Sequence, residues 1–118
     1  MYDYISLYSD DKYSKKIKTE VFESYLSKSL GLKKDSSLKF SKEFNGINIR
    51  LTGIMSNENG SYAYDTLDGV EEINLIEIDI PDNVNAVVEK EITKIAFAIA
   101  KEFSWCVYDQ ETSSKIYP

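Results

Sequence analysis

Two carboxylates, Glu77 and Asp79, alternate within residues 73–80, a segment that reads as a β-strand. Side chains two positions apart on a strand share a face, with backbones about 6.5 to 7 Å apart, which falls within the spacing of the paired acids of glycosidases. The same alternation is the ordinary pattern of a strand with one face in solvent. We prefer this second interpretation and predict no catalytic pair.

Histidine is absent from the chain, and Cys106 is the single cysteine. The usual general base near neutral pH, a Cys-His nucleophile and a His/Cys zinc site are therefore excluded. The sequence also contains no Walker lysine loop, no G-x-G-x-x-G and no G-x-S-x-G motif. We predict that the protein is not an enzyme and that it uses no cofactor.

A calcium loop is the nearest metal motif, because residues 57–60 read Asn-Glu-Asn-Gly, as in the centre of an EF-hand. Met55 and Thr66 stand where that motif requires its first Asp and its bidentate Glu, so no EF-hand is predicted. An irregular divalent site remains open at a cluster of four acids: Asp65, Asp68, Glu71 and Glu72. It supports the alternative function of a small-ligand- or divalent-cation-binding domain without catalytic activity.

Charge is distributed unevenly along the chain. Residues 51–89 contain no lysine or arginine but nine carboxylates, and the net charge of the whole chain is −6. These acids are Glu58, Asp65, Asp68, Glu71, Glu72, Glu77, Asp79, Asp82 and Glu89. Such a field attracts basic proteins and repels nucleic acid and anionic lipid, so we expect a protein partner and neither nucleic acid nor membrane.

Tyrosines lie within the same acidic interval, at Tyr62 and Tyr64. Tyrosine supplies buried area at protein interfaces, while neighbouring acids steer association, although these two rings would equally suit a sheet edge. The predicted partner-binding residues are Glu58, Tyr62, Tyr64, Asp65, Asp68, Glu71, Glu72, Glu77 and Asp79. We predict no metal ligands and no catalytic residues, and the oligomeric state stays open.

The elements that must position these residues begin with a strand over residues 2–8 and a helix over residues 17–30, ended by Gly31. Asn45-Gly46 predicts a two-residue hairpin that pairs Phe44 with Ile47 and Phe40 with Leu51. This register gathers most of the apolar side chains of the hairpin on one face.

Residues 56–72 have no clear period and are predicted to form a long loop of the kind that is often functional. The strand over residues 73–80 ends at Pro81, and Asp82 or Asn83 is expected to cap a helix over residues 84–103. Trp105 and Phe103 are expected to close the core beside a short strand over residues 105–108, with one more strand possible at 115–117.

The predicted order is β-α-β-β-β-α-β(-β), in one globular domain over residues 1–118. It indicates an α+β two-layer sandwich with two helices on one face of a mainly antiparallel sheet. With a single cysteine, no signal-peptide pattern and no apolar run long enough for a membrane span, a cytoplasmic location is expected.

Residues 95–109, IAFAIAKEFSWCVYD, join an alanine-rich helix to an aromatic strand that ends in Tyr-Asp. This segment resembles the C-terminal end of small immunity proteins from bacterial contact-dependent growth inhibition and related polymorphic toxin systems. The resemblance implies a compact, non-catalytic α/β protein that binds and neutralises a cognate toxin domain in the cytoplasm. Many such toxins are nucleases with basic clefts, which an acidic, tyrosine-bearing surface would complement.

Overall fold

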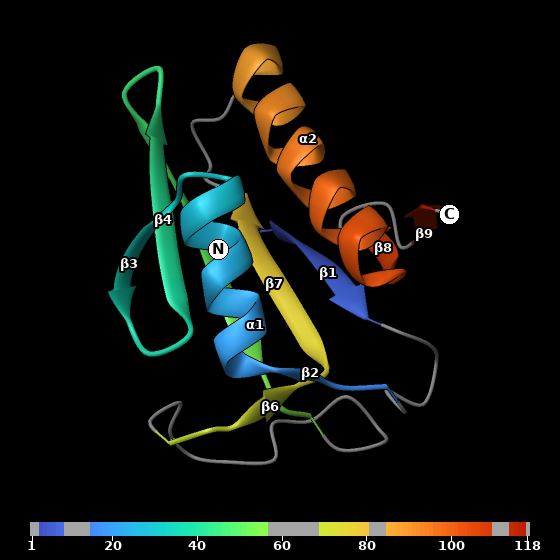
Figure 1. Ribbon diagram of the computed structural model, residues 1–118. Coiled ribbons are helices and arrows are strands. Elements are labelled where there is room, and N and C mark those ends of the chain that lie inside the picture. The colour runs from blue at the N-terminus through green and yellow to red at the C-terminus, as the bar shows by residue number, and fades with distance from the viewer. Residues whose placement is uncertain (1–2, 9–14, 57–68, 81–84, 110–113, 118) are drawn as a thin grey trace.

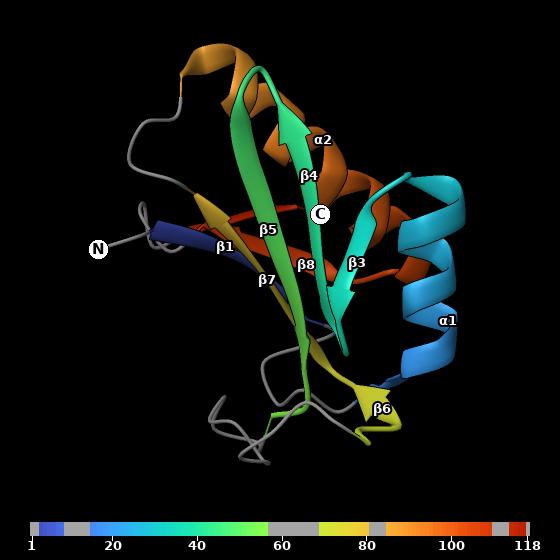
Figure 2. The ribbon, with the colours of Figure 1, turned by 90° about the vertical axis from the view of Figure 1, so that its left-hand side faces the viewer.

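The main antiparallel sheet carries both helical segments on the same face (Figures 1 and 2). The computed structural model describes residues 3–8, 15–56, 69–80, 85–109 and 114–117. Its main sheet has seven strands in the order β3-β4-β5-β7-β1-β8-β9, and each pair of neighbours is antiparallel. The predicted α+β two-layer architecture is confirmed.

The strands of this sheet come from both ends and the middle of the chain. They are β1 (Asp3–Tyr8), β3 (Lys33–Ser36), β4 (Lys39–Phe44), β5 (Ile47–Ile54), β7 (Leu75–Ile80), β8 (Cys106–Asp109) and β9 (Ser114–Tyr117). The central strand, β7, pairs with β1 although more than half of the chain separates them in sequence.

The β4–β5 hairpin has the predicted register, with Phe44 opposite Ile47 and Phe40 opposite Leu51. Asn45 and Gly46 both have positive φ, at 53° and 78°, as a type I′ turn requires. Lys42 is the polar exception on the apolar face. Its ammonium forms an ion pair of 3.1 Å with Glu91 on the covering helix, which places that charge at the margin of the core.

The first helix differs from its prediction over residues 17–30. It divides into an α-helical turn and a half, α1 (Thr19–Ser24), and a π-helix, η1 (Tyr25–Ser29). Gly31 ends it with φ +67°, and the Leu32 N–H donates to the Leu26 carbonyl at 3.0 Å. This bond spans six residues instead of the five of a Schellman ending, because the π-turn has widened the last turn.

The second helix, α2, spans Ala86–Phe103 and begins later than predicted. Its cap is Asn85, whose Oδ1 accepts from the Val88 N–H at 3.0 Å, so the expected cap at Asp82 or Asn83 is wrong. Three capping residues lie within four positions there, and local sequence does not choose among them. Residues 81–84 lie outside the described part of the chain.

The core lies between the helices and the sheet face that they cover. Phe22 and Leu26 from the first helix, Ile92 and Ile99 from α2, and Ile76 from β7 are all buried there. Trp105 is 2% exposed, so its predicted role in core closure is confirmed, and Phe103 packs partly buried beside it. In the part of the chain that the structure describes, no helix combines the length and apolar character that crossing a bilayer requires.

The predicted loop over residues 56–72 is ordered at both ends. Ser56 forms an isolated β-bridge. Residues 72–73 form β6 (Glu72–Ile73), which pairs with β2 (Ile17–Lys18) as a separate two-stranded sheet below α1 (Figure 1). Residues 57–68 lie outside the described part. Neither two-residue strand, nor the exposed edge strand β3, had a sequence pattern long enough to predict it.

Candidate functional site

The predicted partner-binding residues fall into three groups. Glu58, Tyr62, Tyr64, Asp65 and Asp68 lie outside the described residues. Glu71 and Glu72 line a groove with the first residues of α1, and β6, which begins at Glu72, lies on the helical side of the main sheet (Figure 2). Glu77 and Asp79 lie on the other side, the open sheet face, because their neighbours Ile76 and Ile78 point into the core. The described acids therefore belong to two surfaces, although all of them are predicted partner-binding residues.

The first surface is a groove between the start of α1 and the segment that leads into β6. We call it the acidic groove; it has a volume of about 680 Å³ and is lined by Lys18, Thr19, Glu20, Glu23, Glu71 and Glu72. Four carboxylates face one ammonium there. Glu20, Glu71 and Glu72 are exposed, so the groove presents negative charge to solvent.

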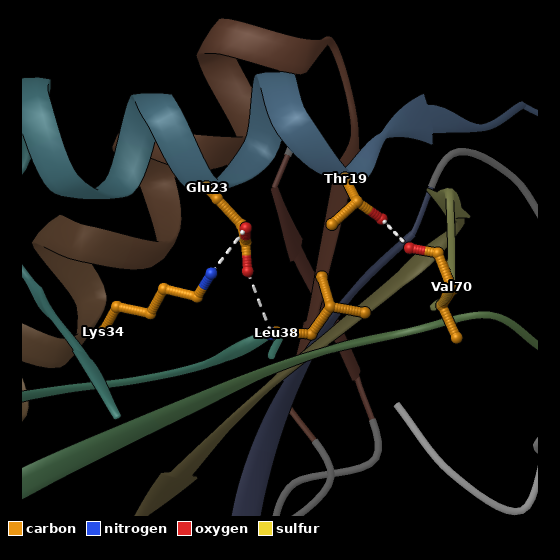
Figure 3. A network of polar contacts seen from close by, with 5 residues as sticks. All are labelled: Thr19, Glu23, Lys34, Leu38 and Val70. Atoms are coloured by element: carbon orange, nitrogen blue, oxygen red, sulfur yellow. Dashed lines mark hydrogen bonds and ion pairs between the residues drawn. The ribbon is translucent and has the colours of Figure 1, made fainter. Parts of the chain in front are cut away.

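Backbone and side-chain hydrogen bonds hold the two walls of the acidic groove together. The Thr19 hydroxyl donates to the Val70 carbonyl at 2.7 Å (Figure 3), and the Thr19 N–H donates to the Glu71 carbonyl at 2.8 Å. Next to them, β2 pairs with β6 through Lys18 and Glu72. Thr19 therefore fixes Glu71 and Glu72 next to Glu20, although fifty residues separate them in the chain.

The Glu23 carboxylate is occupied by hydrogen bonds to other residues of the protein. One carboxylate oxygen accepts from Lys34 Nζ at 3.1 Å and the other accepts from the Leu38 N–H at 3.0 Å (Figure 3). Leu38 is fully buried with φ +61°, a conformation that strains a bulky residue and persists only when its surroundings impose it. Glu23 therefore braces the turn before β4 and contributes structure more than free charge to the acidic groove.

The buried side-chain amide of Asn74 joins the two ends of the segment between Ser56 and β7. Asn74, 2% exposed, accepts from the Ser56 N–H at 2.7 Å and from the Ser56 hydroxyl at 3.0 Å, and it donates to the Ser56 carbonyl at 3.0 Å. The Asn74 side-chain amide therefore bonds the Ser56 backbone N–H and carbonyl as the backbone of a neighbouring β-strand would. They tie the residue before position 57 to the residue after β6, so both ends of the segment are anchored.

The second surface is the open sheet face. Glu77 stands opposite Thr52 on β5 and Ser6 on β1, and it is half-buried. Burial raises the pKa of the Asp79 carboxyl, and the nearby Arg50 guanidinium partly offsets this effect by lowering it. Tyr8 and Tyr108 lie on the same face with ring centroids 6.4 Å apart and ring planes tilted by 53°. This face mixes both signs of charge with aromatic rings.

Glu20 and Arg50 are parts of these surfaces that the sequence did not predict. Glu20 lies in the first turn of α1, and its approach to Glu71 depends on the β2–β6 pairing between distant segments. Arg50 lies on the polar face of the hairpin, opposite the buried Ile49 and Leu51. Its proximity to Asp79 follows only from the pairing of β5 with β7.

The chemistry of both surfaces is electrostatic. Among the described residues, no group of three or more His, Cys, Asp or Glu side chains is arranged to hold a metal ion. The exposed acids of the acidic groove are suited to ammonium and guanidinium groups, which bind carboxylates through charge-assisted hydrogen bonds.

No family model, no curated protein and no solved structure significantly matches the chain.

Proposed function

We propose that the protein is an immunity protein that binds and neutralises a basic toxin domain, such as a nuclease, in the cytoplasm of the cell that makes it. The observation that supports this proposal is the acidic groove. It places the exposed Glu20, Glu71 and Glu72 side by side and anchors their backbone through Thr19.

A preformed acidic surface is suited to recognising a basic one. Complementary charge speeds diffusional encounter, and anchoring the backbone beforehand reduces the ordering that binding requires. A nuclease cleft binds phosphates with lysine and arginine side chains, and carboxylates in the acidic groove can occupy the same positions. The groove would then inhibit its partner by competing with nucleic acid.

The direct test is co-purification with the product of the gene immediately upstream, followed by an assay of nuclease and growth-inhibiting activity of that product. We expect a stable complex, and we expect addition of the protein to abolish the activity at one equivalent. If the product neither binds the protein nor loses activity in its presence, the proposed function is wrong.

Charge reversal tests the assignment of the site. The triple variant Glu20→Lys, Glu71→Lys, Glu72→Lys should slow association with the toxin domain by about tenfold or more at low salt, and by less at high salt. The matched control reverses three exposed acids elsewhere: Glu43→Lys, Glu89→Lys and Glu102→Lys. Both variants change the net charge equally, and circular dichroism checks that each is folded.

The two variants separate a local effect from a global one. A specific site predicts slow association in the groove variant and near-normal association in the control. Equal slowing in both would show that net charge, and not the acidic groove, drives binding. An unaffected groove variant with intact inhibition would move the interface to another surface while leaving the immunity function standing.

A further inference from the structure

The open sheet face carries a second pocket, on the side of the sheet opposite the helices. It has a volume of about 440 Å³, and its polar lining consists of Asp35, Lys39, Asn48, Arg50, Thr52 and Asp79. We call it the open-face pocket. Its size lies within the usual range for small-molecule sites, roughly 300 to 1,000 Å³.

The charges of this pocket are ordered across four neighbouring strands. Asp35 lies on β3, Lys39 on β4, Arg50 on β5 and Asp79 on β7. Because these strands are neighbours in this order, the two carboxylates lie on the outer strands and the two cations on the strands between them. Adjacent strands lie about 4.8 Å apart. Asp35 lies where the register between β3 and β4 shifts, between Lys34 and Ser36, and such an irregularity changes the direction of a side chain.

Arg50 and Asp79 face the same pocket without pairing. Ion pairs within the described residues join Lys34 to Glu23 and Lys42 to Glu91, and none there involves Arg50 or Asp79. Asp79 is half-buried, and Arg50 is near enough to influence its ionisation. Two opposite charges that share a pocket but do not touch leave room for a group that bridges them.

We infer that the open-face pocket binds a small zwitterion of the α-amino acid class, with the ligand carboxylate on Arg50 and the ligand ammonium on Asp79. The guanidinium group presents parallel N–H donors that match a carboxylate, and Asp79 accepts from the ammonium. Thr52 and Asn48 add neutral hydrogen-bonding groups to the same lining. This inference does not depend on the proposed immunity function.

A small ligand fits these observations better than a protein surface does. Both signs of charge converge within a pocket of limited volume, which is the arrangement that fixes the orientation of a small zwitterion. A basic protein would meet Arg50 and Lys39 as repulsive groups. The acidic groove, which presents carboxylates with a single lysine, is the better complement to such a partner.

Titration of the ¹⁵N-labelled protein by NMR tests the inference, with glycine, L-lysine and L-glutamate as probes. We expect saturable shifts of the Arg50, Thr52 and Asp79 amides with at least one probe at concentrations up to about 10 mM, an affinity range within reach of one small ligand. Glycinamide lacks the carboxylate and N-acetylglycine lacks the ammonium. Both should fail to shift these amides.

Variants assign the contacts. Arg50→Gln and Asp79→Asn should each weaken binding of the zwitterion by about tenfold or more, since each removes a charge-assisted hydrogen bond. Glu89→Gln and Lys101→Gln alter exposed charges on α2 and should leave binding unchanged. Absence of shifts with all three amino acids would overturn the inference. So would shifts at these amides caused only by a protein partner, which would make the pocket part of a protein interface.

Discussion

Asn74 offers the sharpest test of how the fold holds the segment between β5 and β7. Asn74→Ala removes three hydrogen bonds to Ser56, one donated by the amide and two accepted by it. The Ser56 N–H and carbonyl then lose their partners at a site that is 3% exposed. An unsatisfied buried group costs about 1 to 3 kcal/mol, so we expect the free energy of unfolding to fall by about 2 to 4 kcal/mol.

Asn74→Asp separates the acceptor function from the donor function. The ionised carboxylate can still accept from the Ser56 N–H and hydroxyl, but it cannot donate to the Ser56 carbonyl. We expect burial and the facing carbonyl oxygen to raise the pKa of the new carboxyl by more than the two accepted hydrogen bonds lower it. Its contribution to stability is therefore present at low pH and is lost as pH rises through the folded pKa, so this variant should be closer to wild type at pH 3 than at pH 7.

Urea denaturation followed by circular dichroism measures these changes. Asn48→Ala serves as the matched control, because Asn48 is an exposed asparagine on β5, and we expect it to change stability by less than about 0.5 kcal/mol. A loss below about 1 kcal/mol for Asn74→Ala would show that water or a rearranged backbone replaces the lost bonds. The proposed anchoring of the segment would then be refuted.

Three further changes test other parts of the fold. Gly53→Ala places a Cβ 2.9 Å from Phe22 and 3.0 Å from Ile73, so we expect calorimetric or urea unfolding to show a loss of about 1 to 3 kcal/mol, and no loss would mean that α1 shifts freely. Asn85→Ala removes the α2 cap and should cost about 1 kcal/mol in the same assay, whereas Asn83→Ala should cost less if Asn85 is the cap. Asp79→Asn should raise stability at pH 7 and have less effect at pH 3, because burial raises the pKa of Asp79 and its ionisation weakens the fold as pH rises. Equal effects at both pH values would contradict that shift.

Local sequence patterns were sufficient to predict the structure of elements that a single segment determines. Asn45-Gly46 specifies a type I′ turn, and period-two alternation beside it determines which faces are apolar, so the β4–β5 register was predicted residue by residue. The apolar residues of α2 likewise recur at helical spacing in the sequence, and Val88, Ile92, Ile95 and Ile99 are all buried. The order of the main elements, and hence the fold class, followed from these patterns.

The sequence did not predict which residue caps α2 or where the first helix changes to a π-helix. Several Asx residues precede α2, and which one caps the helix depends on where the chain leaves the sheet. The π-turn in the first helix has no marker in its apolar spacing, since it widens one turn without moving the buried Phe22 and Leu26 to another face.

The sequence by itself determined that this chain is acidic, that its acids concentrate in residues 51–89, and that its strands and helices make an α+β sandwich. Only the tertiary structure decided which acids share a surface. Pairing of β2 with β6 brings Glu20 to Glu71 and Glu72, while pairing of β5 with β7 turns Asp79 toward Arg50 on the opposite face. Charge composition is a sum over the chain, whereas an electrostatic surface depends on distances, and non-local strand pairing sets those distances.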